Sequence, residues 1–206
     1  MVPLMKSKLG LIVLGVVGLL AFLAVAVGLY GIGIYNRLVT LNEGTNSAWA
    51  QVQNQYQRRA DLVPNLVESV KGYAGHEKET LENVVNARAK VGQLTVTPDV
   101  LKDPQALKNF DRVQGELSSA LSRLMAISEN YPNLKANENF LGLQAQLEGT
   151  ENRIAVERKR FNEVIQEFNT AIRRFPAVFL AGLFGFAPKA YFEARPGAET
   201  ALKVKF

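Results

Sequence analysis

The sequence has no cysteine and a single histidine, and these two shortages exclude several kinds of chemistry. Without cysteine there is no disulfide framework, no thiol nucleophile and no cysteine-ligated metal site. The one histidine, His76, is followed by Glu77 in the sequence HEKET, which lacks the second histidine of a zinc-binding helix. No glycine-rich phosphate loop or G-x-S-x-G nucleophile motif occurs either. We therefore predict a protein that is not an enzyme, with no catalytic, cofactor-binding or metal-binding residues.

Charge is also absent from a long stretch near the N-terminus. No charged side chain occurs from Leu9 to Asn36, a run of 28 residues. About 20 residues of helix cross a hydrocarbon core of ~30 Å, whereas the apolar region of a cleaved signal peptide has only about 7–15. We therefore expect an uncleaved transmembrane helix over residues 9–35. No second uncharged stretch is long enough to span, which excludes a polytopic membrane protein.

Basic residues near the span predict its orientation. Lys6 and Lys8 precede it, and only Arg37 follows it before Arg58. Because the flank richer in lysine and arginine stays in the cytoplasm, residues 1–8 are expected to be a cytoplasmic N-terminus, with the rest of the chain outside. The basic residues of that outer part are spread along the chain, which argues against nucleic acid as a partner.

The rest of the chain has apolar residues at heptad-like spacing, which predicts long helices of coiled-coil type. The clearest apolar seam recurs every seven residues and consists of Phe140, Leu147, Ile154, Phe161, Phe168 and Phe175. A second seam contains Leu107, Phe110, Val113, Leu117, Leu121, Leu124 and Ile127. A third contains Val63, Val67, Val70, Ala74, Leu81, Val84 and Val91. A first helix is expected to continue out of the membrane through Leu38, Leu41, Ala48 and Val52, flanked by Trp49 and Tyr56.

Breaks between these helices are expected at 95–104 and 130–137. Asp103 followed by Pro104 is typical of a helix start, with aspartate as N-cap and proline in the first turn. No alternating pattern is long enough to build a sheet, and only Leu202 to Phe206 resembles a short strand.

The sequence around Pro64 is compatible with two folds. Asp61 could cap a new helix with Pro64 in its first turn, which would give an elongated antiparallel four-helix bundle over residues 36–174. Alternatively, Pro64 only kinks one long helix, and the domain has three long helices. Matched helix lengths favour four, because a kinked rod would leave half its apolar seam uncovered. We therefore predict an all-α fold, a transmembrane helix followed by this bundle.

A short apolar segment opens the last predicted region, residues 175–206, which ends in a C-terminal tail. Residues 175–188 carry no charge but are too few to span a membrane. With four helices the last one returns toward the membrane, so the segment would reach the bilayer surface. It could equally fold back as a cap on the bundle. The candidate membrane-interface residues are Phe175, Phe179, Leu180, Leu183, Phe184 and Phe186.

Two asparagines on the last predicted helix need an explanation. Asn162 and Asn169 are seven residues apart, and each directly follows a phenylalanine of the seam. Asparagine is a mediocre helix former. Buried side-chain hydrogen bonds between helices would explain the pair as a device that fixes register, and an exposed polar face would explain it too.

Several stretches of the sequence resemble the LemA family. They are YNRLVTLNEG (35–44), QRRADLVPNLVESVKGYAGHEKETL (57–81), YPNLKANENFLGLQAQLEGTENRIAVERKRFNEVIQEFN (131–169) and FPAVFLAGLFGF (175–186). The resemblance covers nearly the whole chain and implies a single-pass N-terminal anchor, an antiparallel four-helix exported domain, no known enzyme activity and no cofactor. Some members are associated with membrane metalloproteases of the HtpX kind, and one branch with magnetosome membrane formation. The family pattern gives a candidate interaction motif at Arg58, Arg59, Asp61, Pro64, Asn65, His76 and Glu77.

Together these features predict a non-enzymatic, single-pass scaffold in the bacterial cytoplasmic (inner) membrane, with its bundle on the periplasmic side of the cell envelope. We expect it to self-associate as a homo-oligomer and to organise or shape the membrane. The expected partners are the lipid bilayer and an integral-membrane protein. The alternative is an adaptor or regulator of a membrane protease or envelope-stress system.

Overall fold

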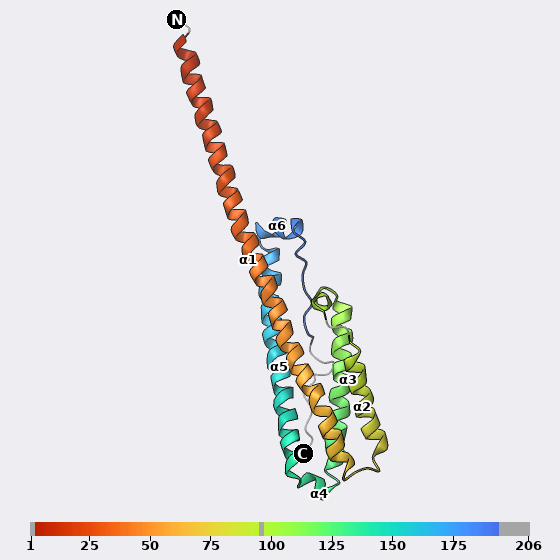
Figure 1. The fold of residues 1–206 in the computed structure, drawn as a ribbon. Helices are drawn as coiled ribbons and strands as arrows, with labels where there is room; N and C mark the ends of the chain where they lie inside the picture. Colours follow the sequence, from red (N-terminus) through yellow and green to blue (C-terminus); the bar gives the residue numbers. More distant parts are fainter. Residues whose placement is uncertain (1–2, 95–96, 194–206) are drawn as a thin grey trace, which may run out of the picture.

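The computed structural model describes residues 3–94 and 97–193, and only helices and connecting segments occur in that part of the chain. The α-helices are α1 (Pro3–Lys71), α2 (Lys78–Gly92), α3 (Pro104–Ser128), α4 (Pro132–Lys135), α5 (Glu138–Arg173) and α6 (Ala177–Leu183), and a 3₁₀ helix, η1, covers Pro98–Lys102 (Figure 1). The all-α prediction is therefore confirmed for these residues. The strand expected at Leu202 to Phe206 lies outside the described residues.

One continuous helix, α1, contains both the apolar stretch and the first helix of the folded domain (Figure 1). Its side chains from residue 11 to residue 30 are all exposed. Within the part of the chain that the structure describes, α1 is the one helix long and apolar enough to cross a membrane. At 1.5 Å per residue, 20 residues extend about 30 Å, the thickness of a hydrocarbon core.

The helix does not break at Pro64, so the predicted helix start at Asp61 is wrong. α1 continues through Pro64, and the chain turns instead at residues 72–77 before α2. Proline has no N–H to bond the carbonyl of residue 60 one turn earlier. The side chain of Arg88 in α2 supplies the missing donor, because its Nε lies 3.1 Å from the oxygen of Ala60.

The alternative of one kinked helix through the whole third seam is also wrong. The turn at 72–77 divides that seam into the end of α1 and the start of α2. Its residues are nevertheless buried on both sides of the turn, from Val63 and Val70 in α1 to Leu81 and Val84 in α2. The seam therefore identified the buried positions correctly but not the place where the chain reverses.

The helices of the domain lie side by side (Figure 1). α1 packs along α5, α2 packs against α3, and α1 also contacts α2. The core contains a cluster at the far end around Leu66, Leu117 and Phe140, and a middle cluster around Trp49 and Phe161. A small third cluster near the apolar end of α1 contains Leu38, Phe168, Ile172 and Ala181.

The predicted helix signals of the second half are largely confirmed. Asp103 caps α3, because its side chain accepts a hydrogen bond of 2.8 Å from the backbone N–H of Gln105. The break at 130–137 contains the single turn of α4. The seven-residue seam is buried along α5, except at its last member. Phe175 lies beyond the end of α5 and is 82% exposed.

Candidate functional site

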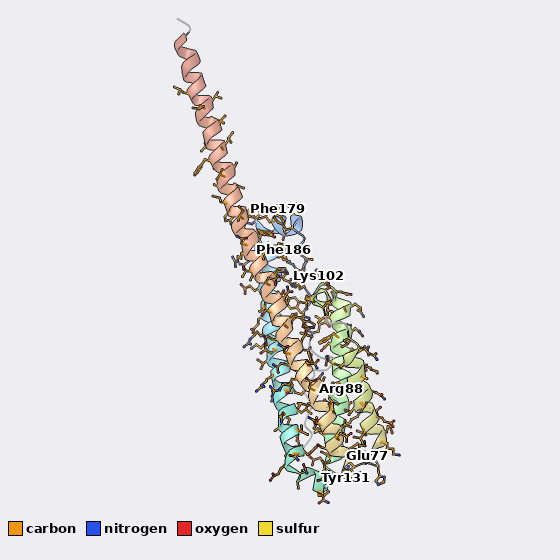
Figure 2. All side chains as sticks on the ribbon, viewed as in Figure 1. Glu77, Arg88, Lys102, Tyr131, Phe179 and Phe186 are labelled. Carbon is orange, nitrogen blue, oxygen red and sulfur yellow. The ribbon has the colours of Figure 1, made fainter. Side chains whose placement is uncertain are left out.

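The end of the domain next to the apolar stretch of α1 is formed by α6, which packs against α1 and α5. The Tyr35 ring centroid lies 4.7 Å from that of Phe184 and 6.0 Å from that of Phe186. Leu180 approaches α1 at Gly31. α6 is therefore seated where the apolar stretch of α1 ends, and Figure 2 shows Phe179 and Phe186 at this junction.

Most of the predicted membrane-interface residues are exposed at this junction. Phe175, Phe179, Leu183 and Phe184 are 82%, 69%, 76% and 53% exposed, whereas Leu180 and Phe186 are half-buried. Four large apolar side chains close together on a short element form an unusual surface for a water-facing protein. Leu180 and Phe186 anchor the element, and the other four form the exposed apolar surface of α6.

Two basic side chains lie close to this surface. Arg37 and Arg174 line a cleft of about 560 Å³ between α1 and α5, together with Tyr30 and Phe175. Glu167 also lines it, on the side of α5. Tyrosine and arginine beside an apolar helix are the side chains found at the depth of lipid head groups.

After α6 the chain continues as a non-helical segment, residues 185–193, which we call the strap. Gly185 has φ of 74°, a left-handed conformation that suits glycine, and the next N–H, of Phe186, donates to the oxygen of Ala181 at 2.9 Å. This C-cap ends α6 and sends the strap back along the helices of the domain (Figure 1).

Asn162 and Asn169 bind the backbone of the strap. The side chain of Asn169 donates to the oxygen of Lys189 at 2.9 Å and accepts from its N–H at 2.8 Å. Asn162 forms the same two bonds with Phe192, both of 2.9 Å. Each asparagine amide thus pairs with the N–H and C=O of one strap residue, the same two groups that a neighbouring β-strand would bind. The asparagines do form side-chain hydrogen bonds, but with the strap rather than between helices.

One aromatic side chain of the strap is buried in the core. Phe192 is 6% exposed, and its ring lies 5.3 Å from Phe161 and 6.0 Å from Trp49. Arg158 covers the other side, with its guanidinium carbon 4.3 Å from the ring centroid, and forms an ion pair of 2.6 Å with Asp111. The strap therefore joins α1, α3 and α5 through a shared aromatic cluster.

The strap also buries an ammonium group. Lys189 is 6% exposed, and its Nζ donates to Thr45 Oγ1 and to Asn46 Oδ1, the latter at 3.4 Å. It lies 5.1 Å from the centroid of the Phe168 ring. Burial lowers the pKa of Lys189 to about 8, and the negative charge of Glu43 opposes this effect only in part.

Of the predicted interaction motif, Arg59 is part of the core. It is 1% exposed and donates to Ser118 Oγ at 2.5 Å, to Glu151 Oε1 at 2.9 Å and to the backbone oxygen of Gln114 at 3.1 Å. A bond to the side chain of Gln114 completes the set. This guanidinium therefore connects α1 with α3 and α5, a structural task that leaves it unavailable to a partner protein.

The other motif residues divide between a helix face and a turn. The exposed side of α1 carries Arg58, Asp61, Pro64 and Asn65, whereas Arg59 is buried on the side that faces the other helices. His76 is exposed in the turn after α1.

Glu77, in the same turn, is half-buried and accepts a hydrogen bond of 3.0 Å from the hydroxyl of Tyr131. This bond raises the pKa of Tyr131, because the neighbouring carboxylate favours the protonated phenol. Figure 2 shows both residues at the far end of the domain. The motif therefore does not converge on one surface.

Sequence reasoning missed the strap and the contacts that its residues Lys189 and Phe192 make with α5. A non-helical segment bound through its backbone leaves no apolar periodicity to detect. The signal that was present is the seven-residue spacing of Asn162 and Asn169, which matches two turns of α5.

The fold and this junction define a membrane-associated, all-helical protein with a long apolar N-terminal helix. The sequence profile of the LemA family matches residues 48–206, which is most of the chain. The chain belongs to the LemA family.

Curated relatives agree with this assignment. The magnetosome protein MamQ of Magnetospirillum gryphiswaldense is 29% identical over 182 residues, covering 81% of this chain and 67% of that protein. Magnetosome protein MamQ 2 of Paramagnetospirillum magneticum is 27% identical over 206 residues, covering 92% and 74%. Protein LemA of Metamycoplasma hominis is 24% identical over 144 residues, covering 70% and 62%. Neither name, MamQ or LemA, denotes an enzyme.

Proposed function

We propose that this protein is a non-enzymatic scaffold, anchored by a single membrane span, that self-associates and organises or shapes the membrane. The observation that carries the proposal is the junction of α1 and α6. The exposed apolar stretch of α1, long enough to span a membrane, ends beside a second exposed apolar surface, made by Phe175, Phe179, Leu183 and Phe184. Two apolar elements at the same level give the domain two contacts with one bilayer surface.

We further propose the topology that the basic residues favour. The N-terminus, with Lys6 and Lys8, would lie in the cytoplasm, and the domain would lie outside the cytoplasmic (inner) membrane. In this arrangement α1 from residue 36, with α2, α3 and α5, acts as an antiparallel four-helix bundle standing on the membrane, and Arg37 and Arg174 meet the head groups. Similarity to magnetosome proteins supports a membrane setting.

Labelling of the full-length protein in lipid vesicles tests the second membrane contact. Because the chain has no cysteine, Phe179→Cys and Leu183→Cys each provide one position for an environment-sensitive fluorophore. Asn65→Cys, exposed on the same protein far from α6, is the matched control. We expect blue-shifted emission and quenching by lipid-borne quenchers at positions 179 and 183 only. Emission like that of the control at both positions would mean that α6 faces water.

Self-association is tested separately, by the mass of the detergent-extracted full-length protein in light scattering. The scaffold is expected to be larger than one copy. A strict monomer that retains no co-purifying partner would contradict the proposal.

A second candidate function is an adaptor for an integral-membrane protein, such as a membrane protease or a component of an envelope-stress system. The exposure of Arg58, Asp61 and Asn65 favours it, because the fold itself does not bury these motif residues. Arg58→Ala and Asn65→Ala should then abolish capture of one defined partner from solubilised membranes. Arg59→Ala is unsuitable for this purpose, since it would disturb the core. Loss of self-association in the same variants would instead favour the scaffold.

A further inference from the structure

The strap is recognised in the way that proteins recognise a bound peptide. Asn162 and Asn169 bond only its peptide groups, so the four hydrogen bonds do not depend on the side chains of residues 189 and 192. A fifth bond joins the N–H of Ala190 to the oxygen of Leu101 in η1, at 2.9 Å. Backbone pairing plus a pocket for one side chain is the usual basis of extended-peptide recognition.

The spacing of the two asparagines matches an extended chain. Seven residues of α-helix advance about 10.5 Å, and three residues of extended chain advance about 10 Å. Asn169 and Asn162 can therefore bind residues 189 and 192 in one register along α5. A slip of the strap by one residue would break this match and remove Phe192 from its pocket.

The pocket for Phe192 supplies the side-chain selection. It is lined by Trp49, Phe110 and Phe161 and covered by the guanidinium of Arg158. An aromatic ring between other rings and a cation is a preferred arrangement. The groove thus selects an extended segment with an aromatic residue three positions after a lysine.

The segment between Phe186, which packs on Tyr35 and Phe168, and Lys189 in the groove is the most weakly held. Residues 187–188 are exposed and not helical. Three extended residues, from Phe186 to Lys189, reach up to about 10 Å. Packed helices lie 8–10 Å apart, so this length allows exchange only between copies whose helices pack directly against each other.

We propose that the groove on α5 is a peptide-binding site whose ligand is the strap, and that neighbouring copies in the membrane exchange straps. This inference rests on the proposed self-association and deepens it by naming the segment that joins two copies. An exchanged strap keeps every contact that it makes within one copy, as in domain swapping. Anchoring in one bilayer holds the grooves of two copies at the same height, which raises the effective concentration of each strap at its neighbour's groove.

Cross-linking between two differently labelled populations tests the exchange. Glu163 on α5 and Tyr191 on the strap are both exposed and line one cleft. Full-length Glu163→Cys and full-length Tyr191→Cys are reconstituted together and treated with a short bismaleimide, which reacts only at these positions because the chain has no cysteine. We expect a covalent dimer of one copy of each variant. Tyr191→Cys mixed with Asn65→Cys is the collision control and should give much less.

Two further variants make the result specific. Phe192→Ala in the strap copy should reduce the dimer several-fold, because it empties the pocket, whereas Asn139→Ala, at an exposed position of α5, should not. In the double variant Glu163→Cys/Tyr191→Cys, cross-linking at high dilution in detergent closes the strap within its own copy. After reconstitution, this closed protein should self-associate less than the same variant without cross-linker.

The outcomes separate this inference from the proposed function. Self-association that persists unchanged in the closed protein overturns strap exchange and leaves the scaffold standing. A monomer under all conditions, by light scattering, contradicts both. Cross-linking no greater than in the collision control, in a sample that light scattering shows to be oligomeric, overturns the exchange alone.

Discussion

Arg88 in α2 donates a hydrogen bond from Nε to the backbone oxygen of Ala60 in α1, 3.1 Å away. This oxygen is the one that Pro64 leaves without an N–H partner in its own helix. A side chain from the next helix thus takes over a backbone hydrogen bond, and α1 passes through the proline to Lys71. Figure 2 shows Arg88 beside α1.

Removal of this donor should destabilise the domain only while the proline is present. We expect Arg88→Ala to lower the free energy of unfolding by about 1 kcal/mol, because a backbone acceptor loses its partner. Pro64→Ala restores the helical N–H, so Arg88→Ala should cost little in that background. A double-mutant cycle, with denaturation in micelles followed by the fluorescence of Trp49, measures the coupling. Additive effects would show that the Arg88 bond does not compensate for the proline.

Arg59 and Arg58 are adjacent in the sequence but should respond very differently to substitution. Arg59→Met removes a buried guanidinium from Ser118, Gln114 and Glu151, and we expect a loss of about 2–4 kcal/mol in the free energy of unfolding. Arg58→Met, at an exposed position of the same helix, is the control and should change stability little. Equal effects of the two substitutions in thermal unfolding would contradict the assigned network.

The two asparagines of α5 should protect the strap from hydrogen exchange. The N–H groups of Lys189 and Phe192 donate to Asn169 and Asn162, so both amides should exchange slowly. Asn162→Ala is expected to speed exchange at Phe192 and to cost about 2 kcal/mol for two lost hydrogen bonds. Asn139→Ala, at an exposed position of α5, should leave the strap protected. Fast exchange at Phe192 in the unaltered protein would contradict the hydrogen bond between its N–H and Asn162.

The buried Lys189 should make stability rise with pH in the mildly alkaline range. Its pKa is about 8 in the folded protein and about 10.4 in an unfolded chain. Between these values the unfolded chain binds more protons, so the free energy of unfolding increases as the pH rises. Below pH 8 both states are protonated and the cost of burying the charge is fully present.

We expect a gain of about 1–2 kcal/mol from pH 7.5 to 9.5. Lys189→Met removes the titrating group and should flatten this profile. Lys159→Met, at an exposed position of α5, serves as the control and should keep it. Denaturant titrations at each pH measure the effect, and parallel profiles for the protein with and without Lys189 would exclude this lysine as its source.

Local patterns predicted the helices well but not where the chain reverses. The seven-residue seam from Phe140 to Phe168 is buried because an α-helix places such residues on one face. The cap at Asp103 was predictable because an N-cap depends on near neighbours. The position of the turn was not, because the donor that makes Pro64 tolerable comes from Arg88, 24 residues later in the sequence.

The candidate site was predictable only in part, for a related reason. The exposed apolar residues of α6 were visible as an uncharged run, whereas the strap is bound by single side chains from distant elements. Asn162 was noticeable as an asparagine directly after a phenylalanine of the seam, but nothing local shows that its partner is the backbone of Phe192. Contacts of this kind become visible only when the three-dimensional arrangement is known.

The continuity of α1 has a mechanical consequence. A helix of 69 residues is about 100 Å long, and no loop separates its apolar half from its folded half. In the proposed topology the part beyond residue 36 would extend about 50 Å from the bilayer. A tilt of about 20°, common for membrane spans, would therefore displace the turn at 72–77 sideways by about 18 Å. In that topology the tilt of the span, which depends on bilayer thickness, would set the lateral position of the far end of the domain.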